Sequence, residues 1–287
     1  VSRDSADVWG NRALFSVLTD GNLYSQSGVP PDYFSETGQL WGTPIYRWQK
    51  HKRTKYKWWR RRLQRQWSQV DLLRIDHFRA LVSYWSVPGD KETAQYGEWL
   101  PSPGLKLLSI LKRDYGSKLP LVAEDLGIIT PQVNRLREYF DLPGMKILQF
   151  AFDGNPANPY LPENINGYNW IVYTGTHDNS TTNGWWNEIT NDVKDRLISR
   201  DNDIETSPSW TLIEMGMKTK SVLFIAPIQD ILSLGNEARL NKPGTIDNNW
   251  SWKINSFNNK LLLDLERYGE LSRECGRSFE DVVNHLQ

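Results

Sequence analysis

The sequence is poor in features that mark several classes of protein. It has one cysteine, Cys275, so no disulfide can form within the chain, and this weakly favours a reducing compartment. Its four histidines provide no second ligand pair at the spacing of a zinc site. No stretch approaches the roughly twenty apolar residues that span a bilayer. The first residues contain no apolar segment typical of a signal peptide. Neither a metal nor a membrane partner is therefore expected.

The chain also lacks an excess of charge of either sign. Its 34 Lys and Arg balance 34 Asp and Glu, which argues against a protein whose main task is to coat nucleic acid. One segment departs from this balance, because residues 47–65 hold ten Lys and Arg and no acid. A nucleic-acid patch and a solvated helix face balanced by acids elsewhere are both consistent with it. The neutral chain favours the second.

Aromatic residues are abundant, with 14 Trp, 12 Tyr and 9 Phe among 287 residues. Aromatic rings pack protein cores, and they also stack on the apolar faces of sugar rings. The composition alone thus raises the possibility of a carbohydrate-handling protein without establishing it.

Residues 1–48 are rich in glycine and proline and are expected to form a long loop region that carries Tyr33, Phe34 and Trp41. Long loops are often lids or binding loops. Residues 44–70 have the spacing of an amphipathic helix. Five β-rich runs then alternate with helical stretches, which predicts an α/β fold with a parallel sheet. These runs are 72–78, 119–124, 145–150, 170–176 and 221–228, with helices expected near 104–115, 131–140, 191–200, before Gly216, and at 258–268.

Two of these runs end in carboxylates that could act in catalysis. Arg74 and Asp76 lie on the same face of the first run, because side chains of a strand alternate between its two faces. The arginine can therefore hold the aspartate ionised and oriented, as a carboxylate nucleophile requires. A structural ion pair explains this pattern equally well. Glu124 follows the second run and shares a face with Val122, so partial burial is expected to raise its pKa, as in a general acid. An acid that merely caps the next turn is the alternative.

The fourth run leads into His177 and Asp178. This pair could provide metal ligands, a nucleophile relay, or a hydrogen-bonding clamp for sugar hydroxyls. The metal interpretation is weak for lack of further ligands, and no nucleophile-elbow motif supports a serine hydrolase. The clamp remains. Three successive strand ends thus carry Asp76, Glu124 and Asp178, and two carboxylates flanking a glycosidic bond are the minimum for glycoside chemistry.

Motifs along most of the chain resemble the amylomaltase or disproportionating-enzyme family, the 4-α-glucanotransferases related to α-amylases. The matching segments are residues 4–9, 28–35, 38–42, 74–79, 123–127, 142–146, 148–152, 174–179 and 241–245. The resemblance implies a (β/α)8 TIM barrel that is truncated in this chain. Residues 1–287 would be its C-terminal portion, with strands four to eight and their helices, and the first three strands would be missing. Residues 1–48 would carry an active-site lid, and residues 49–287 the β/α units and a closing helix.

The resemblance also implies a retaining transfer of α-1,4-glucan segments between maltooligosaccharides or onto glucose. Asp76 would be the nucleophile, Glu124 the acid/base, and the pair should lie about 5–5.5 Å apart. Asp178 and His177 would bind sugar hydroxyls, and Arg74 would orient Asp76. Asp153 would reach the substrate. The lid aromatics Tyr33, Phe34 and Trp41 would hold the sugar chain and exclude water.

No cofactor is implied, and the compartment is expected to be the cytoplasm, or the plastid stroma in a plant or alga. An open five-stranded sheet exposes an edge, so the chain on its own is expected to be poorly folded or inactive. Two alternatives stay open. An α-glucan hydrolase would share the carboxylates, and a non-catalytic glucan-binding protein or inactive fragment would use only the aromatic residues.

Overall fold

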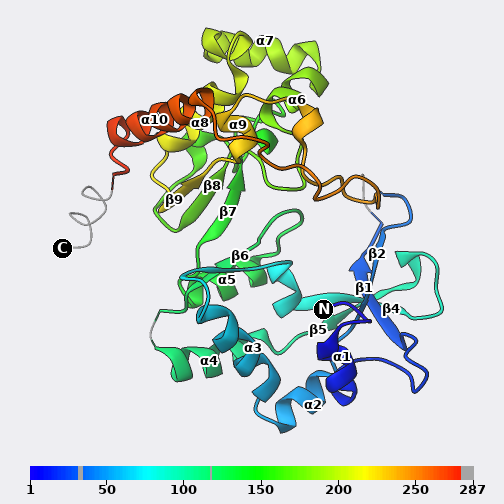
Figure 1. Ribbon diagram of the computed structural model, residues 1–287. Coiled ribbons are helices and arrows are strands. Elements are labelled where there is room, and N and C mark those ends of the chain that lie inside the picture. The colour runs from blue at the N-terminus through cyan, green and yellow to red at the C-terminus, as the bar shows by residue number, and fades with distance from the viewer. Residues whose placement is uncertain (32–34, 117, 279–287) are drawn as a thin grey trace. The chain divides into compact units, whose positions relative to one another are not determined.

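The computed structural model describes residues 1–31, 35–116 and 118–278. Two of the predicted lid aromatics, Tyr33 and Phe34, lie outside the described residues. The chain divides into two compact units, Val1–Gly144 and Met145–Gln287, called unit 1 and unit 2 below (Figure 1).

The helices in the described part of unit 1 are α1 (Ala6–Gly10), α2 (Trp48–Arg53), α3 (Lys57–Trp67), α4 (Gly104–Tyr115) and α5 (Pro131–Tyr139). The helices expected near 104–115 and 131–140 are confirmed. The single helix expected over 44–70 is wrong, because two helices, α2 and α3, occupy that segment. Lys55 and Tyr56 between them have φ of 49° and 56°, in the left-handed region that a right-handed helix cannot include.

The segment expected to be a long loop contains two strands. β1 (Ser25–Val29) and β2 (Gln39–Pro44) join β4 (Ser83–Pro88) and β5 (Glu98–Pro101) in an antiparallel sheet of order β2-β1-β4-β5. Gly28, which looks like a turn signal in the sequence, lies inside β1, where an added Cβ would come 2.1 Å from the carbonyl oxygen of Gln39. The close approach of two strands requires this glycine. Trp41 therefore lies on an edge strand rather than in a loop.

A short parallel ladder lies at the centre of unit 1. β3 (Leu73–Ile75) pairs with β6 (Leu121–Ala123), and Ile75 lies opposite Ala123. Side chains from α3, α4 and α5 bury this ladder in one apolar cluster that includes Leu107, Leu111 and Leu121. Because the two strands are parallel and in this register, the residues that follow them emerge at the same end.

The described residues of unit 2 form three strands and five helices. Its sheet has the order β7-β8-β9, with β7 (Gly144–Ile147), β8 (Trp170–Tyr173) and β9 (Leu223–Ile225), and β8 and β9 are parallel. Figure 1 shows these strands side by side with helices next to them. The helices are α6 (Thr182–Glu188), α7 (Asn191–Arg200), α8 (Pro208–Met217), α9 (Ile228–Ile231) and α10 (Asn259–Glu274). Those expected at 191–200, before Gly216 and at the end of the described chain are confirmed.

The α/β fold class is thus confirmed, and all five expected strands are present, although each is shorter than expected. They form two ladders, β3-β6 and β7-β8-β9, and the described residues contain no closed barrel. Short 3-10 helices occupy several connections: Arg12–Leu14, Phe78–Leu81, Ala94–Tyr96, Leu148–Phe150, Pro162–Asn164, Asn202–Glu205 and Asn236–Ala238.

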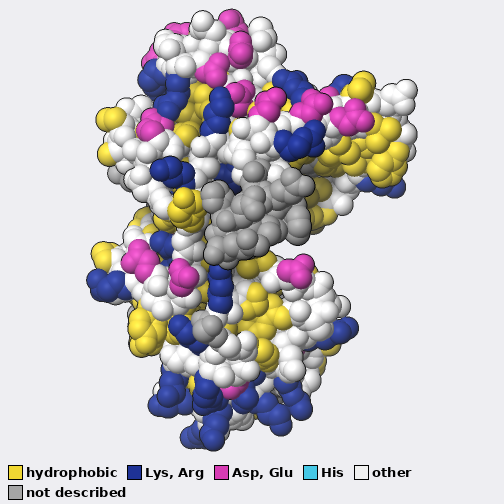
Figure 2. All heavy atoms as spheres, turned by 90° about the vertical axis from the view of Figure 1, so that its left-hand side faces the viewer, with side chains coloured by type: hydrophobic (Ala, Val, Ile, Leu, Met, Phe, Trp, Pro, Cys, Tyr) yellow, Lys and Arg dark blue, Asp and Glu magenta, His cyan; other side chains and the backbone are white. Residues whose placement is uncertain are grey.

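The basic segment over α2 and α3 is partly balanced by acids from other elements. Arg60 contacts Asp114 of α4 at 2.5 Å, and Arg62 pairs with Asp7 of α1. Lys and Arg side chains gather over this part of unit 1 (Figure 2). Within the described part of the chain, no helix is long and apolar enough to cross a membrane. The same residues contain no group of three or more His, Cys, Asp or Glu side chains that could hold a metal ion.

Candidate active site

The parallel pairing of β3 and β6 places Asp76 and Glu124 at the same end of neighbouring strands. The backbone ladder continues past both strands, since the N–H of Glu124 donates to the carbonyl of Ile75 at 3.0 Å. The N–H of Phe78 then donates to the carbonyl of Glu124, also at 3.0 Å. One continuous set of backbone hydrogen bonds therefore fixes the main chain at both Asp76 and Glu124.

The Glu124 carboxylate is fixed through both of its oxygens. Oε2 accepts a hydrogen bond of 2.7 Å from the main-chain N–H of His77, and Oε1 accepts one of 3.2 Å from the N–H of Leu126. Burial raises the pKa of Glu124 above its ordinary value, while the hydrogen bond from His77 and the charge of Arg74 act in the opposite direction. A carboxyl with a raised pKa can hold a proton for donation to a leaving group, as expected from the sequence.

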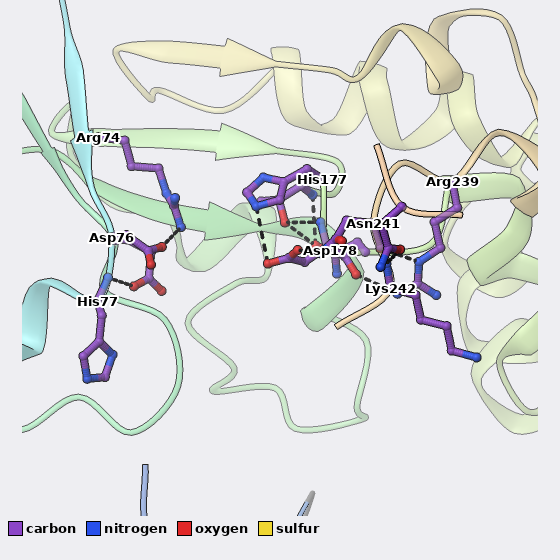
Figure 3. Close-up of polar contacts among 12 residues, drawn as sticks. Arg74, Asp76, His77, His177, Asp178, Arg239, Asn241 and Lys242 are labelled. Carbon is purple, nitrogen blue, oxygen red and sulfur yellow. Dashed lines mark hydrogen bonds and ion pairs between the residues drawn. The ribbon is translucent and has the colours of Figure 1, made fainter. Parts of the chain in front are cut away.

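Asp76 is paired with Arg74, as the strand alternation predicts. Arg74 Nη2 lies 2.7 Å from Asp76 Oδ1 (Figure 3). The Asp76 side chain is 79% exposed, so a ligand can reach its second carboxylate oxygen from solvent. The chain turns sharply directly after it, because His77 has a φ of 50°. An accessible carboxylate held by one guanidinium is suited to nucleophilic attack.

The predicted aromatic Trp41 contacts the residue that follows Asp76. Its ring lies edge-to-face against the His77 imidazole, with ring centroids 4.8 Å apart at an angle of 86°. Burial lowers the pKa of His77 to about 4, so this imidazole is neutral near pH 7. Trp41 remains 41% exposed and can offer a ring face to a ligand.

In unit 2, a loop at 175–181 after β8 carries His177 and Asp178. His177 Nε2 lies 3.4 Å from Asp178 Oδ2, and Asn241 Nδ2 donates to Asp178 Oδ1 at 2.6 Å (Figure 3). Arg239 Nη2 donates to the main-chain carbonyl of Asp178 at 2.7 Å. The Trp250 ring lies 5.2 Å from that of His177. Both predicted side chains are partly exposed, so they can reach a bound ligand.

Asp153, the remaining predicted site residue of unit 2, closes a turn in its own loop. Its Oδ1 accepts from the N–H of Asn155 at 2.9 Å, and this hydrogen bond lowers the pKa of the carboxyl. Within the described residues, no hydrogen bond or ion pair joins Asp153 to His177 or Asp178. A role for Asp153 in substrate binding stays a prediction.

The structure adds residues that were not predicted as part of a site. Arg239, Asn241 and Trp250 follow α9 in the sequence and lie against the 175–181 loop. Asn241 is the first residue of 241–245, one of the segments that resemble the family, and this position is the sequence signal that could have indicated a role in the site. Asp76 and Glu124 belong to unit 1 and Asp178 to unit 2, so the convergence of all three on one sugar stays a prediction.

Comparison with known proteins identifies the family. A family profile described as 4-alpha-glucanotransferase matches residues 1–259. This chain belongs to the 4-alpha-glucanotransferase family. The resemblance seen in its motifs is thereby confirmed.

Named 4-alpha-glucanotransferases are similar over most of this chain. That of Synechocystis sp. is 47% identical over 255 residues, which cover 88% of this chain and 50% of the relative. That of Thermus thermophilus is 44% identical over 261 residues, covering 88% and 52%. The solved amylomaltase from Streptococcus agalactiae, in complex with acarbose, matches with a TM-score of 0.90 at 36% identity, covering 97% of this chain and 56% of that one. The chain spans about half the length of the curated relatives it matches.

Proposed function

We propose that this chain carries the catalytic groups of a 4-alpha-glucanotransferase that transfers α-1,4-glucan segments with retention of anomeric configuration. The observation that carries the proposal is the hydrogen bond of 2.7 Å from the N–H of His77 to the carboxylate of Glu124. It connects a carboxyl group whose pKa is raised by burial to the residue next to an exposed aspartate. A retaining glycoside mechanism requires such a pair of carboxyl groups.

In the first step, an oxygen of Asp76 attacks the anomeric carbon of the donor sugar while Glu124 gives its proton to the leaving glycosidic oxygen. The products are a covalent glycosyl ester on Asp76 and a shortened glucan. In the second step, Glu124 removes a proton from the acceptor hydroxyl, whose oxygen attacks the anomeric carbon and releases Asp76. Arg74, at 2.7 Å from Asp76, keeps the nucleophile oriented through both steps.

His177 and Asp178 bind hydroxyls of the distorted donor sugar in this proposal. Both side chains are partly exposed. Asn241 Nδ2 donates to Asp178 Oδ1 at 2.6 Å, and Arg239 Nη2 donates to the Asp178 main-chain carbonyl at 2.7 Å. These hydrogen bonds fix Asp178 in place, which suits a residue that accepts hydrogen bonds from sugar hydroxyls. Bonds of this kind can strengthen as the sugar ring flattens toward the transition state.

The strands β3, β6, β7, β8 and β9 would be strands four to eight of a (β/α)8 barrel. This assignment is supported by the match to the Streptococcus agalactiae amylomaltase, which has a TM-score of 0.90 and covers 56% of the length of that amylomaltase. It is also supported by the exposure of Val222, Leu223 and Ile225 on or beside the edge strand β9, where a further strand would cover apolar side chains. Residues 1–287 would then be one C-terminal portion of the catalytic barrel.

The proposed substrates are α-1,4-glucans and maltooligosaccharides, with glucose as an acceptor. The Streptococcus agalactiae amylomaltase was solved with acarbose, which supports an oligosaccharide ligand. The proposed steps use carboxyl groups and no cofactor. The compartment would be the cytoplasm or the plastid stroma, and a plastid is supported by the Solanum tuberosum relative, which is named chloroplastic/amyloplastic.

The product pattern from maltotriose tests the proposal. The natural gene product that contains these residues is expected to form glucose together with oligosaccharides longer than maltotriose. Asp76→Asn should lower turnover by about 1,000-fold or more while glucan binding persists. Asp71→Asn, an exposed aspartate just before β3, is the matched control and should leave turnover unchanged.

Two results would contradict the proposal. Shorter products alone would indicate an α-glucan hydrolase. Binding without turnover in the unaltered protein would indicate a non-catalytic glucan-binding protein.

A further inference from the structure

Asp230 of α9 is a buried carboxylate that accepts three hydrogen bonds. Only 1% of the residue is exposed. Its Oδ2 accepts from the hydroxyl of Thr174 at 2.5 Å and from the hydroxyl of Thr182 at 2.8 Å. Its Oδ1 accepts from the main-chain N–H of Thr182 at 2.7 Å. The donors are themselves buried, since neither Thr174 nor Thr182 is exposed at all.

The two threonines mark the ends of the loop that carries His177 and Asp178. Thr174 directly follows β8, and Thr182 is the first residue of α6. One carboxylate from the segment after β9 therefore forms hydrogen bonds with the residues at both ends of the 175–181 loop. Gln149, which is also buried, contributes one more hydrogen bond, from its Nε2 to the carbonyl of Ser180 at 3.0 Å.

A carboxylate in this position costs free energy that apolar side chains would not. Burial of an ionisable group is unfavourable unless hydrogen bonds compensate, and here burial raises the pKa of Asp230 while its three donors act in the opposite direction. A buried polar network whose members are all satisfied fixes one geometry more strictly than apolar contacts do. The network lies beneath a loop whose two functional side chains face solvent in part. The hydrogen bonds of Asp230 can therefore determine the positions of the His177 and Asp178 side chains.

We propose that Asp230 is a positioning residue, whose carboxylate holds the two ends of the 175–181 loop and so fixes His177 and Asp178. Its consequence for turnover rests on the proposed function. The loop's position itself does not, and can be measured separately.

Four variants of the natural gene product separate positioning from general stability. Thr174→Val removes one hydroxyl donor at nearly constant shape, and Thr174→Ser restores that donor. Asp230→Asn keeps the size of the side chain and changes the acceptor of the two hydroxyls. Thr211→Val is the matched control, because Thr211 is a buried threonine of α8 in the same unit whose hydroxyl donates to Ser207 in its own helix turn.

Amide hydrogen exchange of residues 175–181 provides the readout that needs no activity. Thr174→Val and Asp230→Asn should speed exchange there by about 10-fold, a local opening that the lost hydrogen bonds allow. Thr174→Ser and Thr211→Val should exchange like the unaltered protein. Unchanged exchange in Thr174→Val and Asp230→Asn, or equal acceleration in Thr211→Val, overturns the proposal.

Steady-state kinetics on maltotriose provides the second readout. Displacement of the loop should lower kcat about 10-fold in Thr174→Val and about 100-fold in Asp230→Asn, with KM nearly constant. Asp230→Asn added to a variant that carries both His177→Ala and Asp178→Asn should cause little further loss, because Asp230 acts through these two residues. Additive losses overturn the positioning role. If Asp178→Asn alone leaves kcat unchanged, the proposed function fails at that residue, while the exchange experiment still decides the role of Asp230.

Discussion

The main-chain N–H of His77 donates a hydrogen bond of 2.7 Å to the carboxylate of Glu124. His77 directly follows Asp76 and has a φ of 50°, so the turn that ends the Asp76 strand aims its N–H at Glu124. The two carboxylates are thus related through one peptide unit, and their geometry depends on the backbone more than on the packing of either side chain. This relationship makes the individual roles testable by conservative changes.

Glu124→Gln should preserve the fold and remove the acid. The amide oxygen of glutamine can still accept from the His77 N–H, but the side chain can no longer donate an acidic proton. Turnover of maltooligosaccharides should fall by about 10²–10⁴-fold. A maltosyl fluoride donor, whose leaving group needs little protonation, should still react and leave a glycosyl ester on Asp76 that intact-protein mass spectrometry detects.

The control for this change is Glu98→Gln, an exposed glutamate of β5, which should behave like the unaltered protein with both donors. An equal loss with the fluoride and the natural donor would show that Glu124 is not the acid.

Arg74→Gln should change the pH profile as well as the rate. Because the charge of Arg74 lowers the pKa of Glu124, its removal should raise that pKa further above the ordinary value. Glu124 must be protonated to donate, so the alkaline limb of kcat should move to higher pH. The rate at the optimum should fall about 100-fold as Asp76 loses its guanidinium partner. Arg113→Gln, which removes an exposed arginine paired with Asp114, is the control. A shift of the limb to lower pH contradicts the assignment.

The sequence predicts those parts of the structure that depend on local pattern. Apolar runs bounded by polar turns locate β3, β6, β7, β8 and β9, and period-two alternation predicts the Arg74–Asp76 ion pair. Partial burial of Glu124 also follows from its place at the end of an apolar strand.

What the sequence does not predict depends on contacts between distant segments. Gly28 looks like a turn signal but permits a close strand pairing, so the sequence pattern does not reveal β1 and β2. Asp230 has no distinctive neighbours in the sequence, and its role emerges only from donors 48 and 56 residues away. Such partners are brought together by the fold, which a local pattern does not specify.

Trp41→Ala should shift the outcome of turnover from transfer toward hydrolysis. The Trp41 ring, 4.8 Å from that of His77, can stack on a sugar near Asp76 and exclude water from the glycosyl ester. Its loss should raise the ratio of hydrolysis to transfer by about 10-fold, a difference of about 1.4 kcal/mol between the two barriers. Trp41→Phe, which keeps a ring face, should restore part of the transfer.

Trp9→Ala is the matched control, because Trp9 is also an exposed tryptophan of unit 1 but belongs to α1. Product analysis from maltotriose measures both ratios. Equal ratios in Trp41→Ala and the unaltered protein would refute a role for this ring in excluding water.

His51 should make the stability of unit 1 depend on pH. It is fully buried among Phe15, Tyr46 and Trp58, and its Nε2 contacts the carbonyl of Leu14 at 3.2 Å. Burial lowers its pKa from 6.5 to about 4. Between these values the unfolded chain binds a proton that the folded chain does not. The free energy of unfolding should therefore rise with pH across that window and fall on acidification, by about 2 kcal/mol between pH 7 and about pH 5.

Urea unfolding of the natural gene product at pH 7 and at about pH 5 measures this dependence. His51→Gln should be less stable at pH 7, because it loses aromatic packing, and its stability should fall less on acidification. The dependence should not vanish, because burial also lowers the pKa of His77 to about 4 and that residue contributes in the same direction. An unchanged difference between the two pH values in His51→Gln would mean that His51 is protonated in the folded chain or already uncharged in the unfolded one.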